Sequence, residues 1–412
     1  MQLSSSRRTS SGKKINTFTL PGITVAIMFA CGPFMFATVG GRGLFLYLAA
    51  LFFLSIFIQA GFINAQRAFR FSASKELRNS IVTFCLCLFW QLFSFLWSAA
   101  LSFNNVYAYI KVMLFFLLLS IPSYTKHDKK LMVFAQAFIV CIVNFVMITQ
   151  GETIVEEGSE RLTFSFFGVP QDPNYLAFLY IVPALTFWSI IISKQRHPIL
   201  RILSGALLLF LLYGLLSTGS RGALIGIFVA LIIYFIFQKK LVFWKAAFFI
   251  GVGCLLLGLL LTIGVKYLPE SVAERFTLDN ITESGGSNRT LIWQKYLETI
   301  FHDASIFFFG SGNSSGRTTL ISSAHNYIIE SWFDYGLIGL GGIALFFFNL
   351  IFSAWKKKNS FSFAIILGAL AMAFFLSVGK MLQFWLCITI ANILVLPCKA
   401  ESPPESDKKI IE

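Results

Sequence analysis

The sequence predicts an all-α polytopic integral membrane protein with about twelve transmembrane helices. Hydrophobic residues make up 57% of the 412 residues and charged residues 13%, against roughly 25% charged in an ordinary globular protein. So few charges cannot cover a water-soluble surface, and 48 phenylalanines have no soluble core to fill. Since about 20 apolar residues cross a bilayer as a helix, twelve crossings use about 240 residues and leave chain for loops and one modest extramembrane element.

Twelve apolar runs, each bounded by charged residues or by Gly, Pro and Ser, carry this prediction. The first run follows four basic residues as a signal peptide would, but eleven more runs follow, so we expect an uncleaved helix. The runs over 202–217 and 223–238 are short and are also compatible with one hairpin. The run over 325–354 begins with polar residues, so its start is defined only to within several residues. The runs cover 19–38, 43–62, 80–99, 107–124, 131–150, 174–193, 202–217, 223–238, 246–265, 325–354, 361–379 and 381–397.

The distribution of lysine and arginine predicts the orientation, because these residues accumulate in cytoplasmic loops. With both termini inside, 23 of the 33 basic residues lie in inner segments, and every inner segment has at least three. The predicted organisation is a cytoplasmic tail over 1–18, nine helices over 19–266, a large periplasmic loop over 267–324, three helices over 325–397 and a cytoplasmic tail over 398–412. The net charge of +14 therefore reflects membrane topology, and we expect no nucleic-acid partner.

The seven cysteines lie in or beside apolar runs, and their spacing forms no metal or disulfide framework. Buried thiols that pack as small hydrophobic groups are the expected state. Two outer loops have appreciable length. Residues 151–173 are acidic, and the larger loop over 267–324 contains a predicted short helix around Asn288–Phe301, where apolar residues recur at near-helical spacing.

The first candidate for chemistry is the outer turn Ser217–Gly222, which contains Arg221. An arginine next to hydrocarbon is costly unless it reaches the interface or binds an anion. Two glycines allow a ligand to approach the backbone closely, and the hydroxyls add donors. The turn suits a phosphate-bearing lipid headgroup, although an arginine that anchors a helix end among phospholipid phosphates fits as well.

A second candidate is Ser287–Thr290, which opens the predicted loop helix and contains Arg289. Ser287 or Asn288 is suited to cap that helix, and the amide groups of a helix N-terminus favour anions. The guanidinium fork matches phosphate oxygens. From these residues alone, a solvated loop arginine is the favoured interpretation.

The third candidate is His325, which lies where the large loop returns to the membrane. An unperturbed imidazole titrates near pH 6.5, so this side chain is suited to accept a proton from a hydroxyl. An interfacial histidine that only donates hydrogen bonds is the alternative. On the same predicted helix, Glu330 and Asp334 lie four positions apart and therefore share one face. Carboxylates inside a membrane span are candidates for a functional role, and a role in hydrogen-bonded packing is the alternative. The turn-rich segment Phe167–Tyr175, with Pro173 near the first position of a helix, is expected to be structural.

These segments, in this order, resemble the O-antigen ligase/polymerase superfamily of bacterial inner membranes. The resemblance covers about 167–340 and extends to the twelve-span layout. The motifs that carry it are Gly168 with Asp172-Pro173-Asn174, Ser217–Gly222, Asn288-Arg289 with Trp293, Phe309–Gly312, Ala324–Tyr327 and Tyr335–Leu340.

The resemblance is greatest to O-antigen ligases, which are glycosyltransferases of the GT-C class. It implies transfer of O-antigen from undecaprenyl diphosphate to the lipid A-core oligosaccharide at the periplasmic face, without a metal or other cofactor. It also implies that Arg221 and Arg289 bind the diphosphate and that His325 is catalytic. Ser220, Asn326 and Arg317 are further expected substrate contacts, while Lys380 stands where the family sometimes has an acidic residue. The partners implied are the two glycolipids and membrane lipids, with no indication of the oligomeric state.

Alternatives remain open at this point. An O-antigen polymerase uses the same donor with a lipid-linked acceptor, but such enzymes tend to have two large outer loops, whereas this sequence has one. A transporter with the two arginines along an anion path would usually show repeat symmetry or broken helices in corresponding halves, and the sequence shows neither. A purely structural membrane protein would leave the outer arginines without a purpose.

Overall fold

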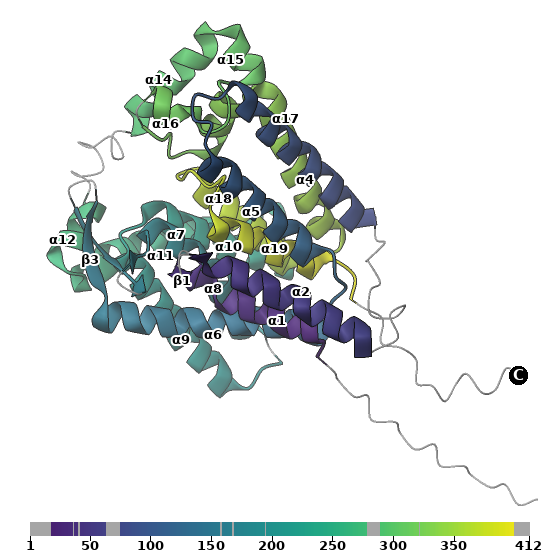
Figure 1. Cartoon of the computed structure of the whole chain (residues 1–412). Coiled ribbons are helices and arrows are strands. Elements are labelled where there is room, and N and C mark those ends of the chain that lie inside the picture. Colours follow the sequence, from purple (N-terminus) through teal and green to yellow (C-terminus); the bar gives the residue numbers. More distant parts are fainter. Residues whose placement is uncertain are drawn as a thin grey trace, which may run out of the picture.

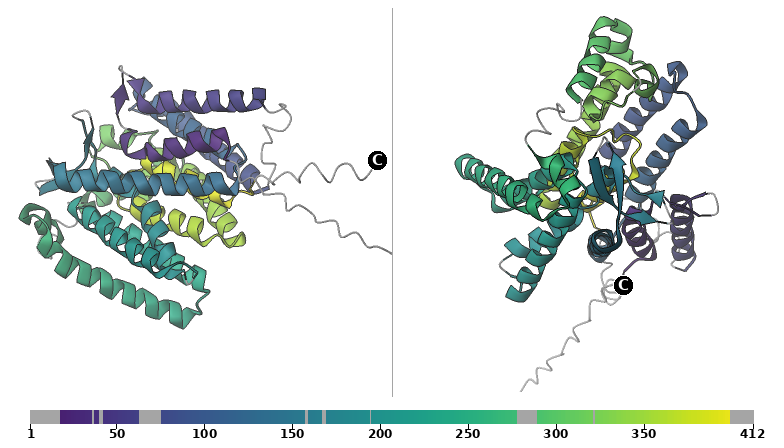
Figure 2. Two further views of the ribbon diagram at one scale, coloured as in Figure 1. Left: turned by 90° about the horizontal axis from the view of Figure 1, so that it is seen from below. Right: turned by 90° about the vertical axis from the view of Figure 1, so that its left-hand side faces the viewer.

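The protein is mostly helical, and its long helices run side by side as a bundle (Figures 1 and 2). The computed structural model describes residues 18–35, 37–39, 42–62, 75–156, 159–166, 169–193, 195–277, 289–320 and 322–398. Within these ranges, eight helical segments are long and apolar enough to cross a membrane, and shorter apolar helices lie among them. The chain is therefore a polytopic membrane protein.

Each of the twelve predicted runs contains a helix, but the lengths differ from the prediction. The first run, expected over 19–38, ends as a helix at Ala30 because Gly32 and Pro33 begin a 3-10 turn. The eleventh, expected over 361–379, ends at Ala373. In chain order the helices are α1 (Leu20–Ala30), α2 (Leu44–Phe62), α4 (Lys75–Phe93), α5 (Phe103–Ser120), α6 (Lys126–Gln150), α7 (Pro173–Phe178), α8 (Ile181–Ile192), α9 (Pro198–Ser217), α10 (Arg221–Lys239), α11 (Phe243–Ile263), α17 (Tyr327–Lys356), α18 (Ser360–Ala373) and α19 (Leu382–Val395).

One end of the bundle is fixed by hydrogen bonds between helix termini. Thr125 and Asp128 form a capping box at the start of α6. The Asp128 carboxylate also accepts hydrogen bonds from the backbone N–H and the hydroxyl of Thr19, both at 2.9 Å, so α1 and α6 start side by side. Lys129 donates to the carbonyl of Leu396, which brings the end of α19 to the same place. These bonds satisfy terminal backbone groups that hydrocarbon would leave unpaired.

At the opposite end of α6, the predicted acidic loop over 151–173 is a set of short antiparallel strands. The strands β3 (Glu152–Glu156) and β4 (Ser159–Thr163) form a hairpin in which Glu152 pairs with Thr163. A smaller pair, β5 (Ser165–Phe166) and β6 (Val169–Pro170), leads into α7. Near the N-terminus, β1 (Thr38–Val39) pairs with β2 (Arg42–Gly43). The sequence analysis did not predict these strands.

The segment 267–324 contains several short helices, which Figure 1 shows beyond the start of α17 and at the left of the view. The helix predicted around Asn288–Phe301 is present as α14, although Asn288 itself lies outside the described residues. Tyr296, Ile300, Ala324 and Phe333 form a small separate hydrophobic core that holds α14 against α17. The elements of this segment are η3 (Gly264–Tyr267), α12 (Glu270–Ala273), η4 (Glu274–Phe276), α14 (Arg289–His302), α15 (Ala304–Phe309) and α16 (Ser315–Thr319).

A kink in α17 holds the loop that follows α15. Gly336 has φ 65° and ψ −173°, a conformation that interrupts the helix and that residues with a Cβ rarely adopt. The carbonyls freed before the kink accept from this loop: Ser311 N–H donates to Phe333 over 2.7 Å, and Gly312 N–H donates to Asp334 over 3.1 Å. The glycine-rich segment after α15 is thus fixed to the start of α17.

The helix α11 lies at the edge of the bundle, as both views of Figure 2 show. It is described throughout, and Gly253 is its one buried residue. Because most of its other residues are exposed, the outer surface of this apolar helix is suited to lipid.

Candidate functional site

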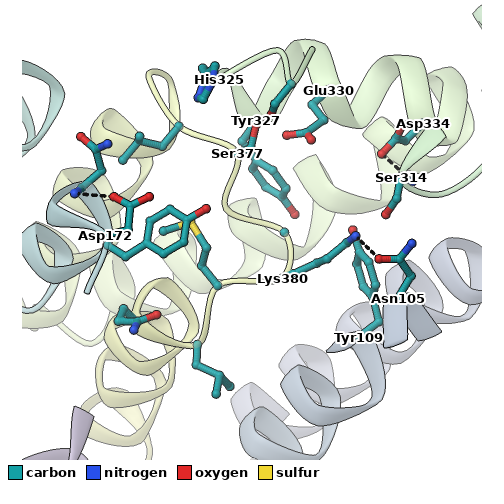
Figure 3. Close-up of a pocket in the computed structure, with 18 of the residues that line it drawn as sticks. Asn105, Tyr109, Asp172, Ser314, His325, Tyr327, Glu330, Asp334, Ser377 and Lys380 are labelled. Atoms are coloured by element: carbon teal, nitrogen blue, oxygen red, sulfur yellow. Dashed lines mark hydrogen bonds between the residues drawn. The ribbon is translucent and has the colours of Figure 1, made fainter. Parts of the chain in front are cut away.

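A cavity of about 680 Å³ opens between α5, α17 and the connection from α18 to α19. Its lining combines both signs of charge with hydroxyl and amide groups. Figure 3 shows Glu330 and Tyr327 directed into it from α17, with Lys380 approaching Asn105 from the opposite wall. The Lys380 ammonium donates to the Asn105 side-chain oxygen over 2.9 Å. Such a polar, water-accessible space is suited to a glycan with many hydroxyl groups.

His325 lies at the edge of this cavity (Figure 3). Its backbone has φ 47°, the left-handed region that histidine enters more often than most residues. The preceding carbonyl, that of Ala324, accepts a hydrogen bond from the Trp293 indole at 2.8 Å. The following residue, Asn326, caps α17 by accepting from the N–H groups of Ile328 and Ile329. His325 is therefore held between two fixed backbone positions.

Glu330 and Asp334 both line the cavity, as expected for two residues on one face of a helix. Asp334 also forms hydrogen bonds with a neighbouring loop. One of its carboxylate oxygens accepts from Ser314 N–H at 2.9 Å and the other from Gly316 N–H at 3.4 Å. These bonds fix the loop that precedes α16. Asp334 is therefore an anchor for this loop, whereas Figure 3 shows Glu330 directed into the cavity.

A second pocket, of only about 20 Å³, brings together Arg221, the first residue of α10, and Arg289, the first described residue of α14. Phe375, just after α18, joins the two. Its carbonyl accepts from Arg289 Nη1 at 3.1 Å, and its side chain packs so tightly on Gly222 that a Cβ there would come within 2.8 Å. A third arginine, Arg275 of η4, lines the same pocket. The cluster of guanidinium groups next to the start of α10 is suited to bind an anion.

Behind this pocket, Arg161 of β4 fixes the turn that precedes α10. Its side chain is 1% exposed. Nε donates to the carbonyl of Thr218 over 2.9 Å, and Nη2 donates to Asn174 Oδ1 over 2.8 Å. The same Asn174 oxygen accepts from the Ser220 hydroxyl over 2.9 Å. The turn predicted to bind a headgroup is thus braced from β4 and α7.

An apolar groove of about 330 Å³ continues from the arginines between α10 and α11. Arg221 and Arg289 line its polar end, and Leu224, Leu257 and Leu261 line its length. The small pocket and the large cavity in turn share Asn174 and Leu376. Three neighbouring spaces therefore follow one another: apolar groove, cationic pocket, polar cavity.

The structure brings Arg221, Arg289 and His325 to these adjoining spaces. Ser220 also lines the small pocket, where it is buried and its hydroxyl donates to Asn174. Asn326 is buried, with its side-chain oxygen occupied by the helix cap. Arg317 belongs to α16, but its side chain lies outside the described part of the structure.

Sequence reasoning missed Arg161 and Arg275 as site residues. A signal for both existed, because each lies in a predicted outer segment where basic residues are uncommon. Asn174, placed in a segment expected to be structural, braces the turn and also lines both spaces. Within the described ranges, no group of three His, Cys, Asp or Glu residues is placed to hold a metal ion.

Residues 206–344 match the family model described as O-antigen ligase. No curated protein matches the chain. A solved structure from "Structural coordination of polymerization and crosslinking by a peptidoglycan synthase complex" aligns with 76% of this chain and 96% of that chain, with 16% identity and a TM-score of 0.46. The matched family segment contains Arg221, Arg289 and His325, and it runs from within α9 into α17. Residues 206–344 are thus similar to the O-antigen ligase family, whose members are glycan-transferring enzymes of the ligase and polymerase type.

Proposed function

We propose that the protein is an O-antigen ligase that transfers O-antigen polysaccharide from undecaprenyl diphosphate to the lipid A-core oligosaccharide. The observation that carries this proposal is the meeting of Arg221 and Arg289 in one pocket between an apolar groove and a polar cavity. A lipid diphosphate needs an apolar channel beside a cationic site, and a glycan acceptor needs a polar space beside both.

The arginines would act on the leaving group. When the bond between the anomeric carbon and the diphosphate oxygen breaks, negative charge concentrates on the diphosphate. Two planar guanidinium groups would stabilise that charge through bidentate hydrogen bonds. Because a stabilised diphosphate leaves readily, the reaction needs neither a general acid nor a metal ion, and we propose that it is metal-independent.

His325 would act on the acceptor. An acceptor hydroxyl in the large cavity attacks the anomeric carbon, forms the new glycosidic bond and gives its proton to the imidazole. Attack opposite the departing diphosphate inverts the anomeric configuration. A retaining route would instead require attack by a carboxylate nucleophile. Ser220, Asn326 and Arg317 stay predicted substrate contacts.

The proposed setting is the bacterial inner membrane, with twelve crossings in the GT-C manner, both termini cytoplasmic and 267–324 periplasmic. The eight long helices and the shorter α1, α2, α18 and α19 supply helices for twelve crossings. The proposed active site then faces the periplasm. A polymerase is the main competing function, and the single large loop over 267–324 favours the ligase.

A defined ligation reaction tests the proposal. The purified chain, in vesicles with lipid-linked O-antigen and lipid A-core, should form core-linked polysaccharide at an unchanged rate in a metal chelator. Growth of longer glycan on the lipid carrier, with no product on the core, would instead identify a polymerase. Loss of ligation in chelator and its return with a divalent ion would refute metal independence alone.

A further inference from the structure

The small pocket contains a third arginine, to which the proposed transfer reaction assigns no role. Arg275 lines this pocket together with Arg221 and Arg289. It reaches the pocket from η4, a different element from the helices that carry the other two arginines, and its side chain is 6% exposed. The described residues that line the pocket include these three arginines and no carboxylate.

The fold is arranged so that Arg275 fits against the α10 turn. Val272 is fully buried, which anchors α12 and η4 to the bundle. Gly219 has φ 64°, and a Cβ at this position would lie 3.0 Å from Cδ and 3.4 Å from Nε of Arg275. The glycine therefore serves two purposes: it permits the left-handed turn and leaves space for the arginine side chain.

Arg275 and its buried neighbour Arg161 have different roles. The Arg161 guanidinium is directed at Thr218 and Asn174, and it braces the turn. It does not line the small pocket, whereas Arg275 does. All three guanidinium groups line one pocket, and an anion with several acceptor oxygens is suited to accept hydrogen bonds from all of them. A diphosphate supplies more charge and more acceptor oxygens than a single phosphate.

We propose that Arg275 is a third ligand of a prenyl-linked diphosphate, bound together with Arg221 and Arg289. This inference rests on the proposed function, because it takes the lipid-linked diphosphate as the donor. The arginine closes the pocket on the side of the Gly219 turn, so that the diphosphate is held from η4, α10 and α14. The prenyl chain would continue into the apolar groove beside Leu257 and Leu261.

Binding measurements on the full chain in lipid nanodiscs test this assignment. The probes are geranylgeranyl diphosphate, geranylgeranyl monophosphate and inorganic pyrophosphate. Arg275→Ala should weaken diphosphate binding by about 10- to 100-fold, the range expected when a charge-assisted hydrogen bond is lost. Monophosphate binding should weaken by a smaller factor, and Arg275→Lys should recover part of the loss. Pyrophosphate should compete poorly because it lacks the prenyl chain.

Arg201→Ala is the matched control. Arg201 lies near the start of α9, at the opposite end of the helix from the turn, and donates to the Ile191 carbonyl, so its loss should leave all three affinities unchanged. Thermal unfolding of each variant identifies any that fail to fold; if Arg275→Ala does, Arg275→Lys and Arg275→Gln replace it.

Three results would overturn the assignment. One is diphosphate affinity within twofold of wild type in Arg275→Ala when Arg221→Ala has lost it. Another is an equal loss of affinity for the monophosphate and the diphosphate in Arg275→Ala, which would mean that Arg275 only supports the turn. The third is competition by pyrophosphate as strong as by the prenyl diphosphate. If the wild-type chain binds no prenyl diphosphate, the proposed function itself fails.

Discussion

Arg161 donates a hydrogen bond to the side-chain oxygen of Asn174 over 2.8 Å, and this oxygen also accepts from Ser220 one position before Arg221. The β3–β4 hairpin therefore contacts the turn that precedes Arg221, one of the two arginines proposed to bind the diphosphate. A guanidinium buried in this way orients the turn through contacts on two sides. Arg161 is in this sense a positioning residue.

Replacing Arg161 with methionine should destabilise the protein and weaken its activity. Arg161→Met keeps the length of the side chain but removes the Arg161 donor to the Thr218 carbonyl and leaves Asn174 Oδ1 with the Ser220 hydroxyl alone. An unsatisfied buried acceptor costs about 1–3 kcal/mol, so thermal unfolding should occur at a lower temperature. Arg196→Met, on an exposed residue, is the control. An unchanged melting temperature for Arg161→Met would remove the bracing role.

Asp334→Asn should loosen the loop before α16. The amide keeps one acceptor and places an N–H₂ group where a carboxylate oxygen now accepts from Ser314 or Gly316. Loss of about 1.4 kcal/mol makes local opening about tenfold more frequent, and hydrogen exchange over 310–320 should accelerate accordingly. Glu298→Gln makes the same chemical change on α14, where Glu298 accepts from Gln294 of the same helix, and should leave that exchange rate unchanged. Equal acceleration in both variants contradicts the proposed anchor.

His325→Ala should lower turnover by roughly 10²–10⁴-fold while the affinity for lipid diphosphate stays near that of wild type, because a general base acts on the acceptor proton. The comparison needs ligation rates and donor binding on the same preparations. His302→Ala, at the exposed end of α14, is the control. A loss confined to donor affinity would instead make His325 a ligand of the diphosphate.

The charge distribution predicts that 310–318 lies in the periplasm and the chain after Lys409 in the cytoplasm. Reporter fusions at both places measure this directly. An alkaline phosphatase fused within 310–318 should be active, and one fused after Lys409 should be inactive. A cytoplasmic signal from the 310–318 fusion would contradict both the topology and the proposed periplasmic active site.

The helical bundle was predictable because each crossing leaves a run of apolar residues, a local feature that composition alone exposes. The same reasoning found α14, where Tyr296 and Ile300 recur on one face and are buried. It placed Glu330 and Asp334 together because they are one helical turn apart. Features that depend on a single helix could thus be predicted from the sequence.

Features that depend on contacts between distant segments were not accessible. The pairing of Glu152 with Thr163 follows no strong alternation in the acidic loop. The early end of α1 depends on Gly32 and Pro33, which a hydropathy run does not register. The burial of Arg161 was unpredictable because its partners come from α7 and the end of α9.

The central claim is that Arg221 and Arg289 act together on one diphosphate, and ligation rates of their single and double alanine variants test it most directly. At matched protein levels, each single variant should lose about 10²–10³-fold or more, since removal of one donor to a transition-state charge costs about 3–4 kcal/mol. Arg221→Lys and Arg289→Lys should both be impaired, because lysine lacks the planar fork. The double alanine variant should lose less than the product of the single losses, because both residues serve one charge. Near-normal ligation by either alanine variant would contradict the account.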